Sequence, residues 1–88
     1  MVLFHYADPA NRESISRLGL KTSFSKAIET GIFFTDTYSK REGLDCWKAN
    51  LKVLEVEEDW TTNPFGDEKW FVCYHDVPAE RLIQDPFK

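Results

Sequence analysis

Two short runs, Leu3-Phe4-His5-Tyr6 and Gly31-Ile32-Phe33-Phe34-Thr35, decide the fold of this chain. Each is an apolar and aromatic run of the length that is typical of a buried strand. The residues between them predict two helical segments, so the chain is expected to begin with a strand, a helix, a short helix and a second strand. Each run also carries groups that packing alone does not need. We therefore expect His5 to meet the Phe33 and Phe34 rings in one cleft; in the alternative, both runs are simply core strands.

The first helical segment is expected to begin at Asp8-Pro9. An aspartate can accept hydrogen bonds from the free N–H groups of a first helical turn, and proline suits the first helical position. Gly19 is expected to end this helix in the manner of a left-handed cap, with Leu20 folding back onto Ile15. A second short helix is expected over 25–30.

The later part of the chain predicts mostly strands. Residues 36–50 suggest a loop or one frayed turn, with Leu44, Cys46 and Trp47 as its anchors. Residues 49–57, Leu54 included, carry apolar groups on both faces, which favours a strand in the interior of a sheet. A further strand is expected over 69–75, and 77–83 predicts either one helical turn or a turn into a last short strand. The expected fold class is α+β, with small mixed or antiparallel sheets and two short helices near the N-terminus.

The composition bounds the function. At 88 residues, the chain is expected to form a single domain over 1–88. An apolar fraction of 42% with 15% aromatic residues favours a folded domain. The net charge of −4 argues against an extended nucleic-acid surface, because phosphate backbones attract basic proteins. The acidic run 55–59 is typical of a solvated face, so a basic target, or a ligand held by hydrogen bonds and stacking, fits better.

Cellular context is predicted from what the sequence lacks. No apolar run approaches the roughly 18 residues that a membrane span needs, and no basic leader precedes Leu3. Cys46 and Cys73 lack metal-ligand spacing, so we expect reduced, buried cysteines in a cytoplasmic protein, with a disulfide between them left open. The sequence shows no metal motif, no glycine-rich phosphate loop and no serine or cysteine nucleophile motif.

A few residues could carry chemistry. His5 is either a core histidine bonded to the backbone or a ribose contact and proton carrier. Phe33 and Phe34 alternate faces, so either both are core or one ring stacks on a planar heterocycle. Glu68 comes just before the strand 69–75, where its carboxylate either faces a cleft or lies in an exposed turn. Exposure is expected for His75.

These residues resemble a known family. Leu3-Phe4-His5-Tyr6, then Ile15-Ser16-Arg17-Leu18-Gly19-Leu20, then Gly31-Ile32-Phe33-Phe34-Thr35 resembles the opening of the ADP-ribosyltransferase fold, as in RNA 2′-phosphotransferases and DNA-modifying toxins of the DarT type. Trp70-Phe71-Val72 followed by 77–83 is similar to the closing segment of that family.

The resemblance implies two small sheets that flank a cleft for NAD. His5 would hold the ribose, Tyr6 would offer backbone groups to the nicotinamide amide, and Phe33 would stack on the nicotinamide ring. Thr35 is implied as a further cofactor-binding residue on the same strand as Phe33. Glu68, together with His5, would be catalytic, since a glutamate stabilises the ribosyl cation in this family.

Two functions are therefore expected from the sequence. In the first, a minimal ADP-ribosyltransferase-like domain binds NAD or an ADP-ribose-type nucleotide and transfers ADP-ribose to a macromolecular target. In the second, a non-catalytic module of the same fold binds and inhibits a host or defence protein through its acidic surface. The short chain implies a core without the usual target-recognition loops, which favours the second; His5 and the aromatic strand favour the first.

Overall fold

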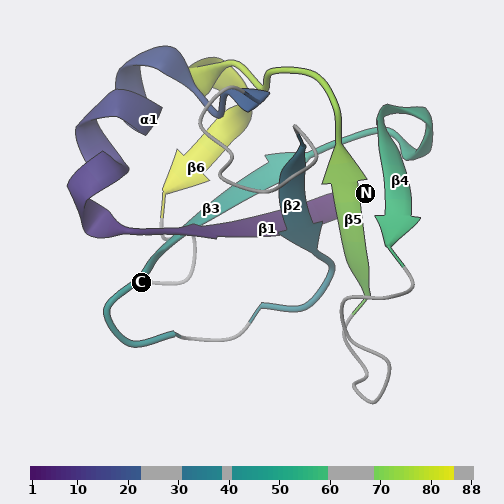
Figure 1. The fold of residues 1–88 in the computed structure, drawn as a ribbon, viewed down its shortest axis with the longest axis horizontal. Coiled ribbons are helices and arrows are strands. Elements are labelled where there is room, and N and C mark those ends of the chain that lie inside the picture. Colours follow the sequence, from purple (N-terminus) through teal and green to yellow (C-terminus); the bar gives the residue numbers. More distant parts are fainter. Residues whose placement is uncertain (23–30, 39–40, 60–68, 85–88) are drawn as a thin grey trace.

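The computed structural model describes residues 1–22, 31–38, 41–59 and 69–84 (Figure 1). The described elements are, in chain order, β1 (Val2–Ala7), the 3-10 turn η1 (Pro9–Asn11), α1 (Arg12–Leu18), β2 (Ile32–Thr35), β3 (Asp45–Asn50), the 3-10 turn η3 (Val53–Glu55), β4 (Val56–Asp59), β5 (Trp70–Cys73), the 3-10 turn η4 (Ala79–Arg81) and β6 (Leu82–Gln84). The α+β class is confirmed, with one short α-helix in this part of the chain. The second helix expected over 25–30 lies outside the described residues.

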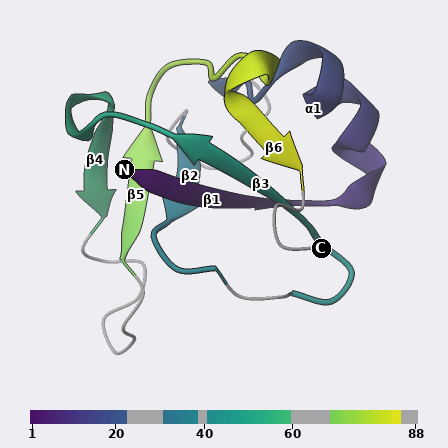
Figure 2. The same ribbon diagram turned by 180° about the vertical axis from the view of Figure 1, so that it is seen from behind.

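The six strands form one antiparallel sheet in the order β4-β5-β2-β1-β3-β6. The expectation of two separate sheets is therefore wrong. The sheet nevertheless has two halves, β1–β3–β6 and β4–β5–β2, and Figures 1 and 2 show the strands of one half running across those of the other. β1 pairs with β3 along its whole length, whereas in the described chain β1 and β2 share the single register pair of Phe4 and Thr35.

The main core lies on the face of the sheet that α1 covers. The helix contributes Ile15 to it, and Leu20 joins through a bridge to Val77. Ile15 and Leu20 thus lie in one cluster, as the sequence predicts. Apolar strand residues complete this core: Leu3, Ile32, Phe34, Trp47, Ala49, Phe71 and Cys73, with Leu51 beyond the end of β3.

The ends of the first helical segment follow from local sequence. The Asp8 side chain accepts a hydrogen bond from the Ala10 N–H at 2.9 Å, and Pro9 takes the first helical position. Gly19 ends α1 with a φ of 77°, and its N–H donates to the Ile15 carbonyl at 2.8 Å. The expected start and end of the helical segment are confirmed, but the expected left-handed cap is wrong, because Gly19 has a ψ of −166°.

Tyr38 and Arg41, which lie between β2 and β3 in the sequence, contact the opposite face of the sheet. The ring of Tyr38 meets Phe4 edge-on, with 5.6 Å between centroids. The Arg41 guanidinium lies 4.4 Å from the centroid of Tyr6 and 5.5 Å from that of Trp70. Cation–aromatic contacts of this kind hold a loop against a sheet. Thr35 and Val72 are buried on this second face.

The expectation of a loop over 36–50 is wrong for its second half. Residues 45–50 form β3, which lies between β1 and β6. Cys46 and Trp47 are buried, while Leu44 is 42% exposed, so its expected role as an anchor is wrong. The polar residues of β3 obscure the alternation of apolar residues that marks a strand. This strand is buried because it lies between β1 and β6, which are distant in sequence.

The expected interior strand over 49–57 is also wrong. β3 ends at Asn50, η3 follows, and β4 lies at the edge of the sheet. Leu54 is 98% exposed. The reason is a closed turn: the Lys52 N–H donates to the Glu55 carboxylate at 2.6 Å, and the Glu55 N–H donates to the Lys52 carbonyl at 2.9 Å. These two hydrogen bonds close a turn over 52–55, and a continuous strand would have to break both of them.

The remaining expectations are confirmed in outline. The strand expected over 69–75 is β5, and 77–83 supplies both a turn, η4, and the short strand β6. Cys46 and Cys73 are buried and do not form a disulfide, which leaves them reduced as expected. Among the described helices, none is long and apolar enough to cross a membrane.

Candidate functional site

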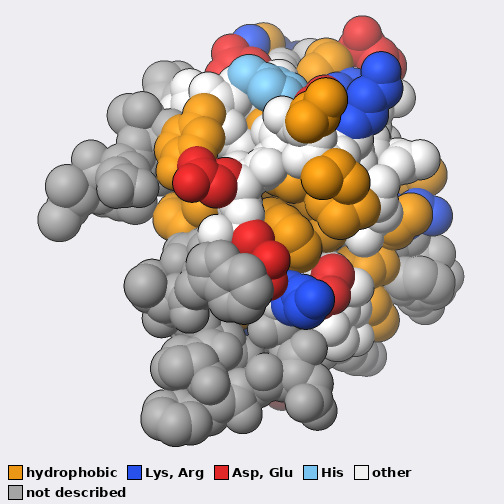
Figure 3. All heavy atoms as spheres, turned by 90° about the vertical axis from the view of Figure 1, so that its right-hand side faces the viewer, with side chains coloured by type: hydrophobic (Ala, Val, Ile, Leu, Met, Phe, Trp, Pro, Cys, Tyr) orange, Lys and Arg blue, Asp and Glu red, His pale blue; other side chains and the backbone are white. Residues whose placement is uncertain are grey.

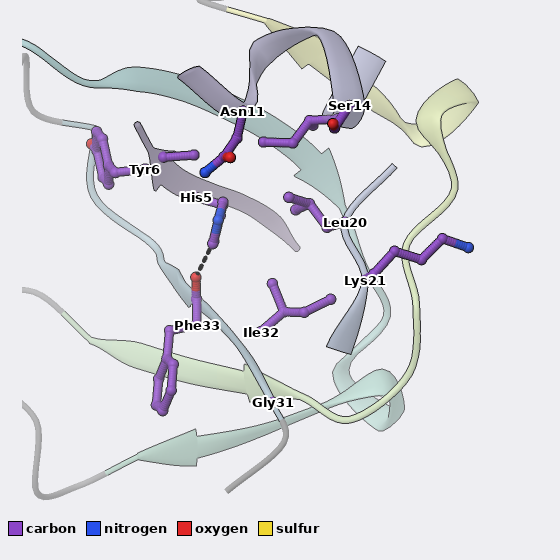
Figure 4. A pocket seen from close by; sticks show the side chains of 11 residues that line it. His5, Tyr6, Asn11, Ser14, Leu20, Lys21, Gly31, Ile32 and Phe33 are labelled. Carbon is purple, nitrogen blue, oxygen red and sulfur yellow. Dashed lines mark hydrogen bonds between the residues drawn. The ribbon is translucent and has the colours of Figure 1, made fainter. Parts of the chain in front are cut away.

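A pocket of about 490 Å³ opens where β1 and β2 diverge beneath α1 (Figure 4). Strands, helix and the segments that flank them all contribute to its wall. The described residues that line it are His5, Tyr6, Ala7, Asn11, Ser14, Ile15, Leu20, Lys21, Gly31, Ile32 and Phe33. A volume of this size is typical of small-molecule sites, which span about 300–1,000 Å³.

His5 stands at the point of divergence. Its Nδ1 lies 2.8 Å from the carbonyl oxygen of Phe33. A side-chain bond therefore joins β1 to β2 just beyond the Phe4–Thr35 register pair. The imidazole also packs against the Phe34 ring, with 5.6 Å between centroids and 57° between planes. Because a side chain replaces a backbone ladder bond here, the two strands stay linked while a gap opens between them.

The bond to Phe33 fixes the tautomer of His5. A carbonyl oxygen only accepts, so Nδ1 must carry the proton and Nε2 must present a lone pair when the ring is neutral. Burial lowers the pKa of His5 below its ordinary 6.5, and the bond to the Phe33 carbonyl opposes this only partly. Within the described residues, Nε2 has no hydrogen-bond partner. The site thus offers one neutral acceptor to a ligand that can donate.

The charge of the pocket differs from that of the whole chain. The net charge is −4, yet none of the described lining residues is a carboxylate. Lys21 is the cation at the rim, and its Nζ lies 3.5 Å from the Asp76 carboxylate. Figure 4 shows the Lys21 side chain directed away from the centre of the pocket. Because the described lining contains no carboxylate, it would repel an anionic ligand little.

The structure brings together three of the residues singled out in the sequence. His5, Tyr6 and Phe33 all line the pocket. Figure 4 shows the rings of Tyr6 and Phe33 directed away from its centre, so their backbones face the ligand more than their rings do. Phe34 is fully buried in the main core.

The remaining two candidates are Thr35 and Glu68. Thr35 is fully buried opposite Phe4, and its hydroxyl accepts from the Thr37 N–H at 3.3 Å. It is not among the described lining residues and supports the junction of the two halves instead. Glu68 falls outside the described residues.

Asn11, Ser14 and Lys21 were not singled out in the sequence. The start of the helical segment at Asp8-Pro9 was the available signal for Asn11, because it places this residue one turn later, at the cap of α1. Gly31 was expected as the first residue of the second strand run, but it also keeps the pocket wall close to β5. A Cβ at this position would collide with the Val72 side chain.

The acidic and histidine candidates near β4 and β5 belong to a different region. Glu57 is exposed on β4, and His75 is exposed as predicted. His75 Nε2 lies 3.4 Å from the Glu55 carboxylate, which Arg81 also binds. The described chain holds no group of three or more side chains that could bind a metal ion. Comparisons of the chain with protein-family models, with curated proteins and with solved structures found no match.

Proposed function

We propose that the pocket between β1, β2 and α1 binds NAD or an ADP-ribose-type nucleotide. The observation that carries this proposal is His5, whose Nε2 has no hydrogen-bond partner among the described residues. It is an acceptor held in place by the bond from Nδ1 to the Phe33 carbonyl. A ribose hydroxyl is a donor of the required kind. The resemblance of the flanking runs to the ADP-ribosyltransferase fold supplies the identity of the nucleotide.

Size and charge support a nucleotide. The pocket has about 490 Å³ available, and its described lining contains no carboxylate that would repel phosphates. The backbones of Tyr6 and Phe33 border the gap between the diverging strands, where a carboxamide can bond to peptide groups. These features match the roles that the resemblance gives to His5 and to the backbone of Tyr6. They do not match the stacking role of Phe33, because its ring is directed away from the centre of the pocket.

Transfer of ADP-ribose to a macromolecular target is the catalytic form of this proposal. Cleavage of the N-glycosidic bond builds positive charge on the ribose, and a carboxylate beside it stabilises that charge. Since no described lining residue is a carboxylate, transfer would depend on Glu68. A domain without that contribution would bind the nucleotide and leave it intact.

Calorimetric titration with NAD and with ADP-ribose tests the binding. His5→Ala should weaken either ligand by about 1–3 kcal/mol, the cost of leaving a buried polar contact unpaired. His75→Ala is the matched control, because His75 is exposed and does not line the pocket. Equal affinity in wild type and His5→Ala would remove His5 from the site. Absence of binding by the wild type would overturn the proposal.

Mass spectrometry for released nicotinamide separates catalysis from binding. Glu68→Gln should keep the affinity for NAD while abolishing nicotinamide release. Glu57→Gln and Glu58→Gln serve as controls, since both lie on β4. Turnover that survives in Glu68→Gln contradicts the role given to Glu68. If NAD binds but neither the wild type nor any variant releases nicotinamide, the domain binds NAD without cleaving it.

A second candidate function is the binding of a protein partner, and one observation favours it. Val53 is 68% exposed and Leu54 is 98% exposed, on a turn that Glu55 and Arg81 hold in place. Figure 3 shows apolar side chains gathered on this side of the molecule, with acidic groups among them. The partner that fits is a basic segment with an apolar anchor. Loss of binding to a lysine-rich, leucine-containing peptide in Leu54→Ser, but not in Ile83→Ser, would support it; equal binding would not.

A further inference from the structure

We propose that Asn11 is a second hydroxyl-binding residue of the pocket, so that Asn11 and His5 together read the vicinal diol of a ribose. This inference rests on the proposed function and specifies the chemical group that the pocket recognises. It assigns a binding role to a residue that the sequence patterns did not mark as a site residue.

The first observation is that Asn11 does not serve the helix it precedes. Asparagine at this position commonly accepts a hydrogen bond from the second or third N–H of the helix. Here the Asn11 side chain makes no capping bond, and the backbone has a φ of −94° and a ψ of 0°. No hydrogen bond joins its amide to another described residue. The amide is thus available to a ligand.

The second observation is its direction. Asn11 and His5 both line the pocket, one from the start of α1 and the other from β1. Figure 4 shows the Asn11 amide directed toward His5 and into the same space. Two polar groups from separate elements therefore converge on one part of the cavity.

The third observation is that the backbone of Asn11 is held. Arg12, the next residue, makes two hydrogen bonds of 2.8 and 2.9 Å to the Asp45 carboxylate, which is 4% exposed. On the other side, the Asn11 N–H donates to the Asp8 carbonyl at 2.9 Å. The position from which the Asn11 amide extends is therefore fixed before a ligand binds.

The chemistry of the pair matches a diol. His5 Nε2 is an acceptor, so it requires a donor. The Asn11 amide offers one acceptor and two N–H donors. Adjacent hydroxyls satisfy both, since one can donate to Nε2 and the other can donate to or accept from the amide. A fully ionised phosphate cannot donate to Nε2, so this part of the pocket selects hydroxyls.

A ligand–mutant cycle tests the inference. Nicotinamide mononucleotide has one ribose, and its 2′,3′-dideoxy analogue lacks the diol. Asn11→Ala should weaken the first ligand about tenfold and the second less than about twofold, because a lost partner matters only where the hydroxyl is present. Ser16→Ala, on the exposed side of α1, is the control and should change neither affinity. Melting temperatures should be similar for all variants.

The outcomes are distinct. If Asn11→Ala weakens both ligands equally, Asn11 shapes the start of the helix and the inference is wrong, while nucleotide binding stands. If Asn11→Ala leaves both affinities unchanged, Asn11 does not touch the ribose, which also overturns the inference. If the wild type binds neither these ligands nor NAD or ADP-ribose, the proposed function fails and removes this inference with it.

Discussion

The backbone of Val77 leaves no room for a side chain at Gly19. A Cβ at this position would collide with the Val77 carbonyl oxygen, and Gly19 also has a φ of 77°. We expect Gly19→Ala to destabilise the fold by more than about 2 kcal/mol, since the clash adds to the roughly 1–3 kcal/mol cost of a backbone conformation that essentially only glycine adopts. Thermal unfolding measures the loss.

Gly43→Ala is the matched control for that variant. Gly43 has a φ of 80°, yet a Cβ there would meet nothing within 4 Å. It should therefore show the conformational cost alone. Equal losses for the two variants would mean that contact with the 77–79 segment does not constrain the end of α1.

Truncation of Leu51 should lower the stability of the fold strongly, whereas truncation of Leu54 should barely change it. Leu51 is fully buried and Leu54 is 98% exposed, although they lie three positions apart. Leu51→Ala should cost about 2–4 kcal/mol through lost burial and the cavity that remains. Leu54→Ala should change the free energy of unfolding by less than about 0.5 kcal/mol, as most surface substitutions do. Urea unfolding of both variants checks this, and a large loss in Leu54→Ala would contradict the turn at η3.

Glu55 should give the domain an acid-dependent stability. Hydrogen bonds from Arg81, and then from the Lys52 N–H, lower the pKa of Glu55 from 4.5 to about 2. A carboxyl whose pKa is lower in the folded state stabilises the fold above its unfolded pKa and loses that contribution as the pH falls. The loss should therefore run from about pH 4.5 down to about pH 2 and, with solvent screening, amount to about 1 kcal/mol.

Stability measured against pH in Glu55→Gln tests this assignment. The variant should lack most of the decline between those two pH values, because an amide does not titrate. Glu57→Gln, whose parent side chain is exposed on β4, should keep the decline of the wild type. A wild-type slope in Glu55→Gln would assign the effect to another carboxylate.

His5 should be less protonated in the folded protein than in the unfolded chain. Burial lowers its pKa below 6.5, so the unfolded chain takes up a proton more readily than the folded one. Its contribution to stability is full above about pH 6.5 and is lost as the pH falls toward the folded pKa. Nitrogen NMR should show a proton on Nδ1 and none on Nε2. Protonation of Nε2 at pH 7 would contradict the acceptor role proposed for this atom.

Arg12 should stabilise the fold by pairing with the buried carboxylate of Asp45. The guanidinium makes two hydrogen bonds to it, and the Asp45 side chain is 5% exposed. Arg12→Ala leaves a buried charge without its partner and should cost about 2–3 kcal/mol, at or below the lower end of the range for broken buried pairs because Arg12 is itself half exposed. Arg17→Ala, on the same helix, is the control and should cost little. Similar melting temperatures for both variants would contradict the prediction.

The parts of the fold that local signals control were predictable. Asp8-Pro9 and Gly19 mark the helical segment, and two aromatic runs mark β1 and β2, because each signal acts within a few residues. β3 was not predicted, since its polar residues are accommodated by partners on β1 and β6 that the local pattern does not reveal. Leu54 was misplaced because its apolar character matched a strand period that the Lys52–Glu55 turn interrupts.

The site was predictable to a similar degree. His5 and Phe33 lie on two aromatic runs that were expected to be neighbours, so their proximity followed from the fold class. The role proposed for Asn11 depends on where β1 and β2 separate, and no spacing along the chain encodes that point. The tautomer of His5 likewise needs the position of the Phe33 carbonyl.

The way the chain threads through the sheet has a consequence for how the protein unfolds. β1, β3 and β6 belong to one half of the sheet, and β2, β4 and β5 to the other, so the chain passes back and forth between the halves. Neither half can assemble from a continuous piece of chain. The chain connections link the two halves to each other several times, although β1 and β2 share a single register pair at the junction in the described chain. Unfolding of one half should therefore unfold the other in the same cooperative transition.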